Sequence, residues 1–314
     1  MDAFKIEVLA TTDDPLDSLS AHAALAADAS FAPRVLPTFR PDAYIKFWLD
    51  GFATRAEALI QSAGDGLAGY AGYIRAMANR REYFVRHGAV SSDHGSQTAA
   101  FLKLSPAEAS ALFEKGMAGT ATFSEALAFE AHMMYVQAAL AVEDGLVMTM
   151  HPGVHRNTHA HSLNTFGPDT GHDIPFAVDY ASGLLPMLED FGTAPGFHFI
   201  PFTIDETVFS REIAPLAGFY PSIFIGAPWW FLDAPDAMLR FRSAVTETAG
   251  FTRSSGFIDD TRAFCSIPAR HDTSRRIEAS FLARLVAEHR ISEERAHHII
   301  VDLVDGSPRR AFKL

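Results

Sequence analysis

The stretch Leu-Val-Met-Thr-Met at residues 146–150, followed by His-Pro-Gly-Val-His-Arg at residues 151–156, shows the pattern that decides the fold. A short apolar run ends in an imidazole, and polar residues follow. Ala/Leu-rich segments of helical periodicity separate such runs, and strands that alternate with helices predict a parallel sheet. The other runs of this kind are Lys5–Ala10, Arg34–Pro37, Gly88–Ser92, Gly196–Phe202, Ile223–Ala227 and Phe251–Ile258.

Several helix ends are marked in the sequence. Ser105-Pro-Ala-Glu108 is typical of a capping box with proline in the first turn. Asp233-Ala-Pro-Asp236 indicates the start of another helix, and apolar residues at helical spacing over 277–286 indicate a further one. Gly145 and Gly250 follow helical patterns and precede strands, which suits C-terminal caps.

Polar chemistry gathers where the apolar runs end. In a (β/α)₈ barrel, the carboxyl ends of all strands open on one face, and the site is built there from many loops. A doubly wound sheet instead binds its ligand at one switch point, and no Gly-rich nucleotide motif follows a strand here. The distribution therefore predicts a TIM-type barrel, although only about seven strand-and-helix units are recognisable. The polar clusters are Thr11–Pro15, Arg40–Asp42, Asp93–His94, His151–Arg156, Thr203–Asp205, Trp229–Trp230 and Asp260–Arg262.

The charge balance and the cysteine content exclude some classes of partner and structure. The chain has 314 residues, 26 basic against 38 acidic, and a formal charge of −12. Because nucleic acids and anionic membranes require a basic surface, neither is an expected partner. The single cysteine, Cys265, excludes an internal disulfide framework and is expected to be a buried small residue. No apolar run reaches the length of a membrane span, and the N-terminus lacks signal-peptide features, so we expect a cytoplasmic protein.

Asp260 and Arg262 form the sharpest local feature. They follow the apolar pair Phe257-Ile258, and a strand that continued through them would turn both side chains to one side. The carboxylate could then ligate a divalent metal or act as a base, and the guanidinium could hold an oxyanion or a sugar hydroxyl. The alternative is an aspartate helix cap followed by a solvated arginine.

The segment 151–161 contains four of the fourteen histidines. His151 follows a strand directly and should project into the mouth of the barrel. His159 and His161 have the spacing of a metal-binding pair on a strand, but their polar neighbours favour a solvated loop. Arg156 lies in the same segment.

Three further positions stand at strand ends. Asp93 is either a functional carboxylate or a turn residue. Arg40 precedes a proline, so its backbone is expected to be extended, and it suits a carboxylate or phosphate ligand unless it forms a surface ion pair. Of the tryptophans Trp229 and Trp230, one is expected to line a pocket and the other to lie in the core.

Beyond these single features, the chain resembles the uronate isomerases (glucuronate isomerases) of the amidohydrolase superfamily, from Lys5 almost to the C-terminus. The matching stretches, in order, are Thr11–Leu19 (TTDDPLDSL), Val35–Asp42 (VLPTFRPD), Ser92–His94 (SDH), His151–Asn157 (HxGxxRN), Gly167–Gly171 (GPDTG), Gly226–Phe231 (GAPWWF), Asp260–Arg262 (DTR) and Arg270–Arg276 (RHxxxRR).

The resemblance implies a metal-associated barrel that interconverts D-glucuronate with D-fructuronate and D-galacturonate with D-tagaturonate. By similarity, Asp260 corresponds to a metal-ligating aspartate and Arg262 to its catalytic partner. Asp93, His151 and Trp229 fall on active-site positions, and Arg40 on a substrate-binding position. The full implied assignment is catalytic Asp260, Arg262, His151 and Asp93, substrate-binding Arg40, Arg156 and Trp229, and metal-binding Asp260.

The family pattern begins with a strand that carries an HxH metal motif, followed by a catalytic tyrosine, and this sequence starts after both. We therefore expect residues 1–314 to form a single (β/α) barrel domain that lacks the first strand, with Met1 an internal methionine. The divalent metal, zinc first and manganese or iron as alternatives, is expected to bind weakly. A homo-oligomer is expected. The alternatives are a metal-dependent hydrolase of the same superfamily and an inert fragment or assembly module.

Overall fold

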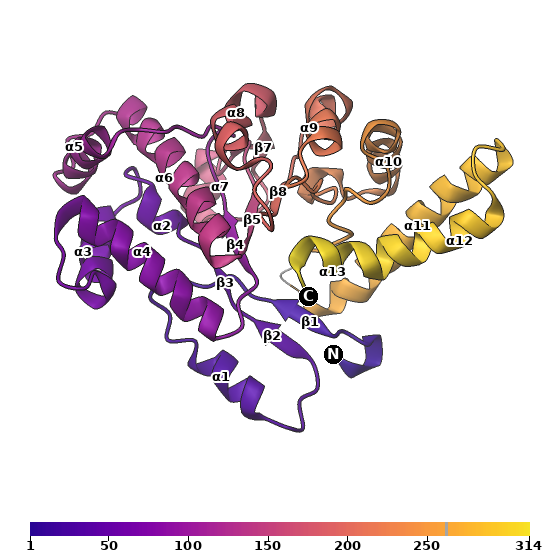
Figure 1. Ribbon diagram of the computed structural model, residues 1–314, viewed down its shortest axis with the longest axis horizontal. Helices are drawn as coiled ribbons and strands as arrows, with labels where there is room; N and C mark the ends of the chain where they lie inside the picture. Colours follow the sequence, from indigo (N-terminus) through magenta and orange to yellow (C-terminus); the bar gives the residue numbers. More distant parts are fainter. Residues whose placement is uncertain (261–262) are drawn as a thin grey trace.

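A computed structural model describes residues 1–260 and 263–314 of the chain. In Figure 1, the strands β3, β4, β5 and β8 lie toward the middle of the molecule with helices around them, and β1 and β2 lie at the lower edge near the N-terminus. The strands are β1 (Val8–Ala10), β2 (Arg34–Leu36), β3 (Thr38–Phe39), β4 (Ser91–His94), β5 (Val147–Met150), β6 (Val154–His155), β7 (Ile174–Pro175) and β8 (Phe199–Pro201).

The parallel strands follow the chain order, whereas β6 and β7 form a separate antiparallel pair. β1 pairs with β2, and β3, β4, β5 and β8 pair in that sequence, all in parallel. Single parallel bridges extend the sheet at both ends: Asp13 to Phe39, Phe199 to Ile223, and Ile225 to Ser254. Because Pro37 alone separates β2 from β3, the described residues form a series of seven parallel strand positions. Sequential order of this kind is the topology of a barrel wall.

Helices connect the strands, and several pack on the next helix along the chain, as α3 does on α4, α9 on α10 and α10 on α11. The capping box predicted at Ser105 is present at the start of α5. The helices are α1 (Ser20–Ala27), α2 (Asp42–Ile45), α3 (Phe52–Ala63), α4 (Gly69–Arg86), α5 (Pro106–Met117), α6 (Phe123–Asp144), α7 (Ala160–Phe166), α8 (Tyr180–Phe191), α9 (Ala214–Phe219), α10 (Pro235–Ala249), α11 (Ile267–Ala287), α12 (Glu293–Val301) and α13 (Ser307–Phe312), with short 3₁₀ or π turns η1 (Asp2–Phe4), η2 (Glu206–Val208), η3 (Phe209–Ile213), η4 (Trp230–Leu232), η5 (Phe264–Ser266) and η6 (Asp302–Gly306).

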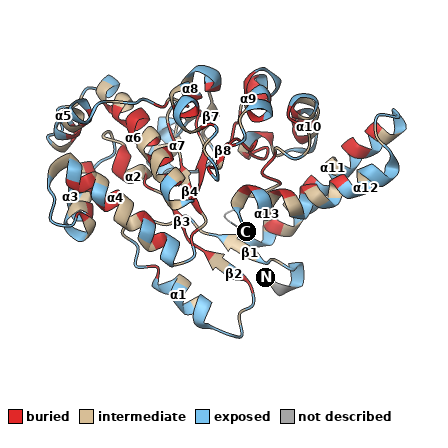
Figure 2. Cartoon of the chain, in the orientation of Figure 1, coloured by how far each residue is buried: buried red, intermediate tan, exposed pale blue. Residues whose placement is uncertain are grey.

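Alternation along the strands creates two cores. In β5, Met148 packs in the large cluster shared with the helices, whereas Val147 packs in a smaller cluster. In β8, Phe199 packs in the large cluster and Ile200 in the smaller one. Successive strand residues point to opposite faces, so the large cluster lies between sheet and helices and the small one lines the concave side. Figure 2 shows the buried residues on the strands and on the facing sides of the helices.

The C-terminal helix closes the end of the sheet opposite to the strand carboxyl ends. Lys313 Nζ donates to the carbonyls of Gly145 (2.7 Å) and Gly196 (2.6 Å), which precede β5 and β8. His198 Nδ1 lies 3.0 Å from the carbonyl oxygen of Ala311, which is fully buried. These contacts leave the carboxyl ends of the strands as the open face.

Three sequence predictions about the fold need correction. The run Ile223–Ala227 forms only single bridges, at Ile223 and Ile225. The run Phe251–Ile258 forms only a single bridge at Ser254, because Gly256 adopts a φ of +70° and ends the extended backbone. The histidine pair is not in a loop, since His159 stands at the N-cap of the short helix α7 and His161 lies within it. The parallel α/β arrangement is as predicted, and no helix in the described ranges is long and apolar enough to cross a bilayer.

Candidate active site

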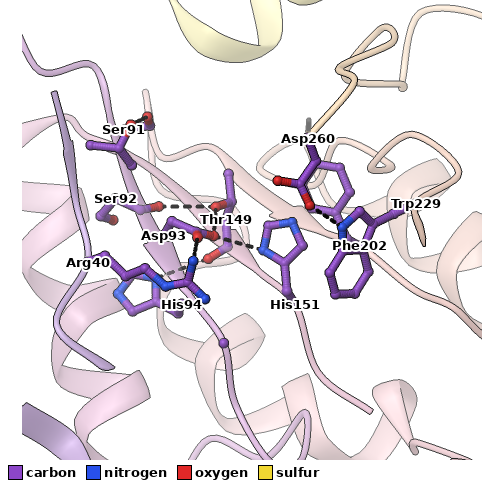
Figure 3. A network of polar contacts seen from close by, with 12 residues as sticks. Arg40, Ser91, Ser92, Asp93, His94, Thr149, His151, Phe202, Trp229 and Asp260 are labelled. Atoms are coloured by element: carbon purple, nitrogen blue, oxygen red, sulfur yellow. Dashed lines mark hydrogen bonds and ion pairs between the residues drawn. The ribbon is translucent and has the colours of Figure 1, made fainter. Parts of the chain in front are cut away.

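Asp93 is the centre of the polar network at the open face (Figure 3). It comes from β4, and its side chain is only 13% exposed. Its carboxylate accepts a hydrogen bond from Thr149 Oγ1 (2.6 Å) and lies 2.8 Å from His151 Nδ1 and 3.2 Å from Arg40 Nη1. Burial alone would raise the pKa of Asp93, but His151, Arg40 and Thr149 together hold that pKa well below its usual value.

Arg40 follows β3 and joins this network to a second carboxylate. Its Nε donates to Asp42 Oδ2 (3.0 Å), and Lys46 Nζ lies 3.4 Å from the same oxygen. The backbone N–H of Gly95 also donates to Asp42, at 3.1 Å from each oxygen. Burial would lower the pKa of Arg40, but the charges of Asp93 and Asp42 outweigh burial and raise it. Arg40 is therefore a fixed cation whose side chain is 34% exposed.

Aromatic rings hold His151 from two sides. Its imidazole stacks on Phe202, with ring centroids 4.3 Å apart and an interplanar angle of 11°. Trp229 meets it edge-on, with centroids 4.6 Å apart. The backbone N–H of His151 donates to the carbonyl of His94 (2.8 Å), which fixes the chain as it leaves β5. The ring is thus oriented before any ligand binds.

Asp260 joins the site through Trp229, whose indole N–H donates to the Asp260 carboxylate. Asp260 has a φ of +41°, in the left-handed region that few non-glycine residues adopt. The charge of Asp260 also contributes to the raised pKa of Arg40, so both groups face the same space. Strained backbone of this kind occurs preferentially at functional sites.

Side chains from the ends of several strands therefore meet at one mouth. Arg40, Asp93, His151, Trp229 and Asp260, far apart in the sequence, lie together as the strand-end pattern predicted. Sequence reasoning missed the contribution of Phe202, which ends an apolar run. Its position as the last residue of that run was the available signal, because it places the ring at the carboxyl end of β8.

Other sequence candidates lie elsewhere or in different settings. Arg156 is 46% exposed, pairs with Asp169 (3.2 Å) and stacks over Trp230, whose indole contacts that of Trp229. Arg262 lies outside the described residues. Cys265 is exposed, contrary to the expectation of burial, because it lies in η5 at the surface.

The His, Cys, Asp and Glu side chains of the described residues do not cluster as metal ligands. Among residues 1–260 and 263–314, no three His, Cys, Asp or Glu side chains form a group that could hold an ion. Asp260 is engaged by Trp229, and His151 Nδ1 faces Asp93. The carboxylates and the imidazole that the described residues bring to the mouth therefore do not form a complete set of metal ligands.

Comparisons with known proteins agree with this geometry. A family model described as glucuronate isomerase matches residues 1–310. A uronate isomerase of Corynebacterium efficiens is 62% identical over 311 residues, covering 99% of this chain and 66% of the relative. A uronate isomerase of Cutibacterium acnes is 48% identical, covering 100% of this chain and 67% of the relative. This chain therefore spans about two thirds of the length of the curated relatives it matches.

Solved structures give the same result. The crystal structure of glucuronate isomerase from Caulobacter crescentus has a TM-score of 0.95 and 46% identity, covering 99% of this chain and 65% of that one. The crystal structure of uronate isomerase from Thermotoga maritima has a TM-score of 0.92 and 27% identity, covering 99% of this chain and 68% of that one. A crystal structure described as a metal-dependent hydrolase from Lactobacillus casei has a TM-score of 0.62 and 17% identity, a likeness of fold alone. The predicted TIM-type α/β fold is confirmed by these matches.

Proposed function

Because the chain belongs to the glucuronate isomerase family, we propose that it catalyses aldose–ketose isomerisation of hexuronates. The reaction would interconvert D-glucuronate with D-fructuronate and D-galacturonate with D-tagaturonate. The observation that carries this proposal is the convergence of Arg40, Asp93, His151 and Asp260 at one mouth. An anionic sugar needs a cation for its carboxylate and acid–base groups near its carbonyl, and both kinds of group are present there.

The chemistry requires one proton transfer between carbon atoms. A base removes the proton from C2, the electron pair forms the C1–C2 double bond, and the C1 oxygen gains a proton to give a cis-enediol. Loss of the O2 proton and protonation at C1 then give the ketose. We propose Asp260 as the base and Arg262 as the group that stabilises the enediolate.

The remaining groups would orient the substrate. His151 and Asp93 are 2.8 Å apart and would pass protons to the sugar oxygens or hold its hydroxyls. Arg40 would bind the uronate carboxylate, since within the described residues its Nη2 has no hydrogen-bond partner. Arg156 is proposed as a second cation. Because the indole N–H of Trp229 is taken by Asp260, we propose that its ring contacts the sugar.

We also propose a divalent metal, zinc first and manganese or iron next, with Asp260 as its ligand. The support is the Asp260 carboxylate at the mouth, because carboxylates are common ligands of divalent cations in proteins. When bound, a metal would polarise the substrate oxygens. Since the described residues do not complete a ligand set, no step above depends on it. Self-association into a homo-oligomer is a further proposal, to be measured by light scattering.

The test is turnover in deuterated water. The purified chain is incubated with D-glucuronate or D-galacturonate, with zinc, manganese, iron or a chelator, and the C2 proton signal is followed by NMR. We expect loss of that signal together with ketose formation, and neither with Asp260→Asn. Asp272→Asn, which changes an exposed carboxylate of α11, is the matched control. No exchange under any metal condition would refute the proposal, and hydrolysis of esters or phosphoesters would favour a hydrolase.

A further inference from the structure

Glu130 is a buried acid that the proposed mechanism does not use. It lies on α6 and is 2% exposed. Its Oε2 accepts a hydrogen bond from the backbone N–H of Gln97 (3.1 Å), whereas its Oε1 is buried with no partner in the described residues. An incompletely paired buried carboxyl costs free energy, so packing alone does not account for it.

The groups around Glu130 belong to the site network. Burial raises the pKa of Glu130 to about 7, the charge of Lys46 and the Gln97 N–H oppose the rise, and the charge of Asp42 adds to it. Asp42 pairs with both Lys46 and Arg40, and Arg40 is a member of the candidate site. Glu130, on α6, therefore lies near the ion pairs that surround Asp42.

The turn after β4 connects Glu130 to Arg40. Two amides of this turn, two residues apart, are each held by a carboxyl group: the Gly95 N–H by Asp42 and the Gln97 N–H by Glu130. The contact at Gly95 is close, since a Cβ there would lie 2.9 Å from Asp42 Oδ2 and 3.1 Å from Arg40 Nη2. A movement of the turn would consequently displace Asp42 and Arg40 together.

We propose that Glu130 is a positioning residue of the candidate active site, which holds the 94–97 turn so that Asp42 orients Arg40 toward an anionic substrate. The inference rests on the proposed function for the identity of that substrate, a hexuronate. The mechanical link from the Gln97 amide through Gly95 to Asp42 does not depend on the proposed function.

Two substitutions separate this role from a general effect on stability. Glu130→Ala removes the acceptor for the Gln97 N–H, and Glu130→Gln keeps an acceptor oxygen of the same shape. We expect Glu130→Ala to weaken hexuronate binding, and to raise KM, at least tenfold with a smaller change in kcat, because a displaced Arg40 affects ground-state binding first. Glu130→Gln should restore affinity to within about twofold of the wild type.

Controls come from the same helix. Glu143→Ala changes an exposed acid of α6, and Ala141→Gly loosens the buried side of α6 about three turns from Glu130. Neither should alter KM or the dissociation constant measured by calorimetry. An unchanged constant in Glu130→Ala, or an equal loss in Ala141→Gly, would overturn the proposal.

A crystal structure of Glu130→Ala decides the matter without turnover. We expect the 94–97 turn to move and the Arg40 to Asp93 contact to lengthen beyond its present 3.2 Å. If Arg40 and Asp42 keep their positions, Glu130 does not position them. If the wild-type chain neither binds nor converts hexuronates, the proposed function fails, while the crystal structure still tests the positioning role.

Discussion

Replacing Asp93 tests the central contact of the site through stability alone. The two oxygens of Asp93 have different partners: Oδ1 faces Thr149 Oγ1 and His151 Nδ1, and Oδ2 faces Arg40 Nη1. In Asp93→Asn, one amide oxygen can serve only one of these sides. The amide nitrogen then faces either the Arg40 guanidinium, which is another donor, or the Thr149 and His151 pair. Asp93→Ala removes every partner.

The magnitude follows from burial. Breaking a buried ion pair by removing one partner costs about 3–5 kcal/mol, and we expect Asp93→Ala to lower the free energy of unfolding by this amount. Asp93→Asn keeps part of the hydrogen bonding, so we expect a loss of about 1–3 kcal/mol. The ranking, alanine worse than asparagine, depends on the side chain being only 13% exposed.

The effect should depend on pH in one direction. The pKa of Asp93 lies below its usual value in the folded chain, since His151, Arg40 and Thr149 outweigh the effect of burial. Ionised Asp93 therefore stabilises the fold fully above its unfolded pKa of about 4, and that stabilisation is lost as the pH falls below it. The stability gap between wild type and Asp93→Asn should be constant above about pH 5 and narrow below about pH 4.

Urea unfolding followed by circular dichroism, at about pH 7 and again at about pH 3.5, measures both effects. Asp272→Asn serves as a control, because this carboxylate is 61% exposed and should produce no resolvable change. Two results would show that the network at β4 does not hold the site as described. One is an Asp93→Ala variant as stable as the wild type, and the other is a difference in free energy of unfolding between wild type and Asp93→Asn that is the same at both pH values.

Three further predictions concern single contacts. Trp229→Phe removes the indole donor to Asp260, and we expect kcat in steady-state assays to fall about tenfold to a hundredfold with little change in KM; a change in KM alone would argue against this. Gly95→Ala should weaken calorimetric hexuronate binding about tenfold, because the new Cβ would crowd Arg40; unchanged affinity contradicts the close contact. Arg81→Met breaks the ion pair of a fully buried arginine and should cost about 3–5 kcal/mol in urea unfolding; a loss under about 1 kcal/mol would contradict it.

The parts of the fold that depend on local chemistry could be predicted from the sequence. The capping box at Ser105 forms as expected, because its two hydrogen bonds involve only neighbouring residues. The run 147–150 is a buried strand because four consecutive apolar or β-branched residues suit the middle of a parallel sheet. Strand-end positions were enough to bring Asp93 and His151 together, since parallel strands end on a common face.

Features that depend on distant partners could not be predicted. The extended run after Phe251 shortens to a bridge at Ser254, and the left-handed backbone at Gly256 that ends it has no marker beyond the glycine itself. The exposure of Cys265 follows from the place of η5 at the surface, which composition does not reveal. Glu130 had no signal at all, because a glutamate within a helical pattern is normally a solvated residue.

The site also explains how a chain with a net charge of −12 could hold an anionic substrate. Asp42 is shared among Arg40, Lys46 and the Gly95 N–H, and Asp93 is shared among Arg40, His151 and Thr149. Arg40 uses Nε for Asp42 and Nη1 for Asp93, and within the described residues its Nη2 has no hydrogen-bond partner. This Nη2 group is therefore the donor that a substrate carboxylate could reach. Local field, and not net charge, governs the binding of an ion in a cleft. A substrate carboxylate at the exposed part of Arg40 would add a charged acceptor for the guanidinium, whereas a neutral sugar would add no charge there.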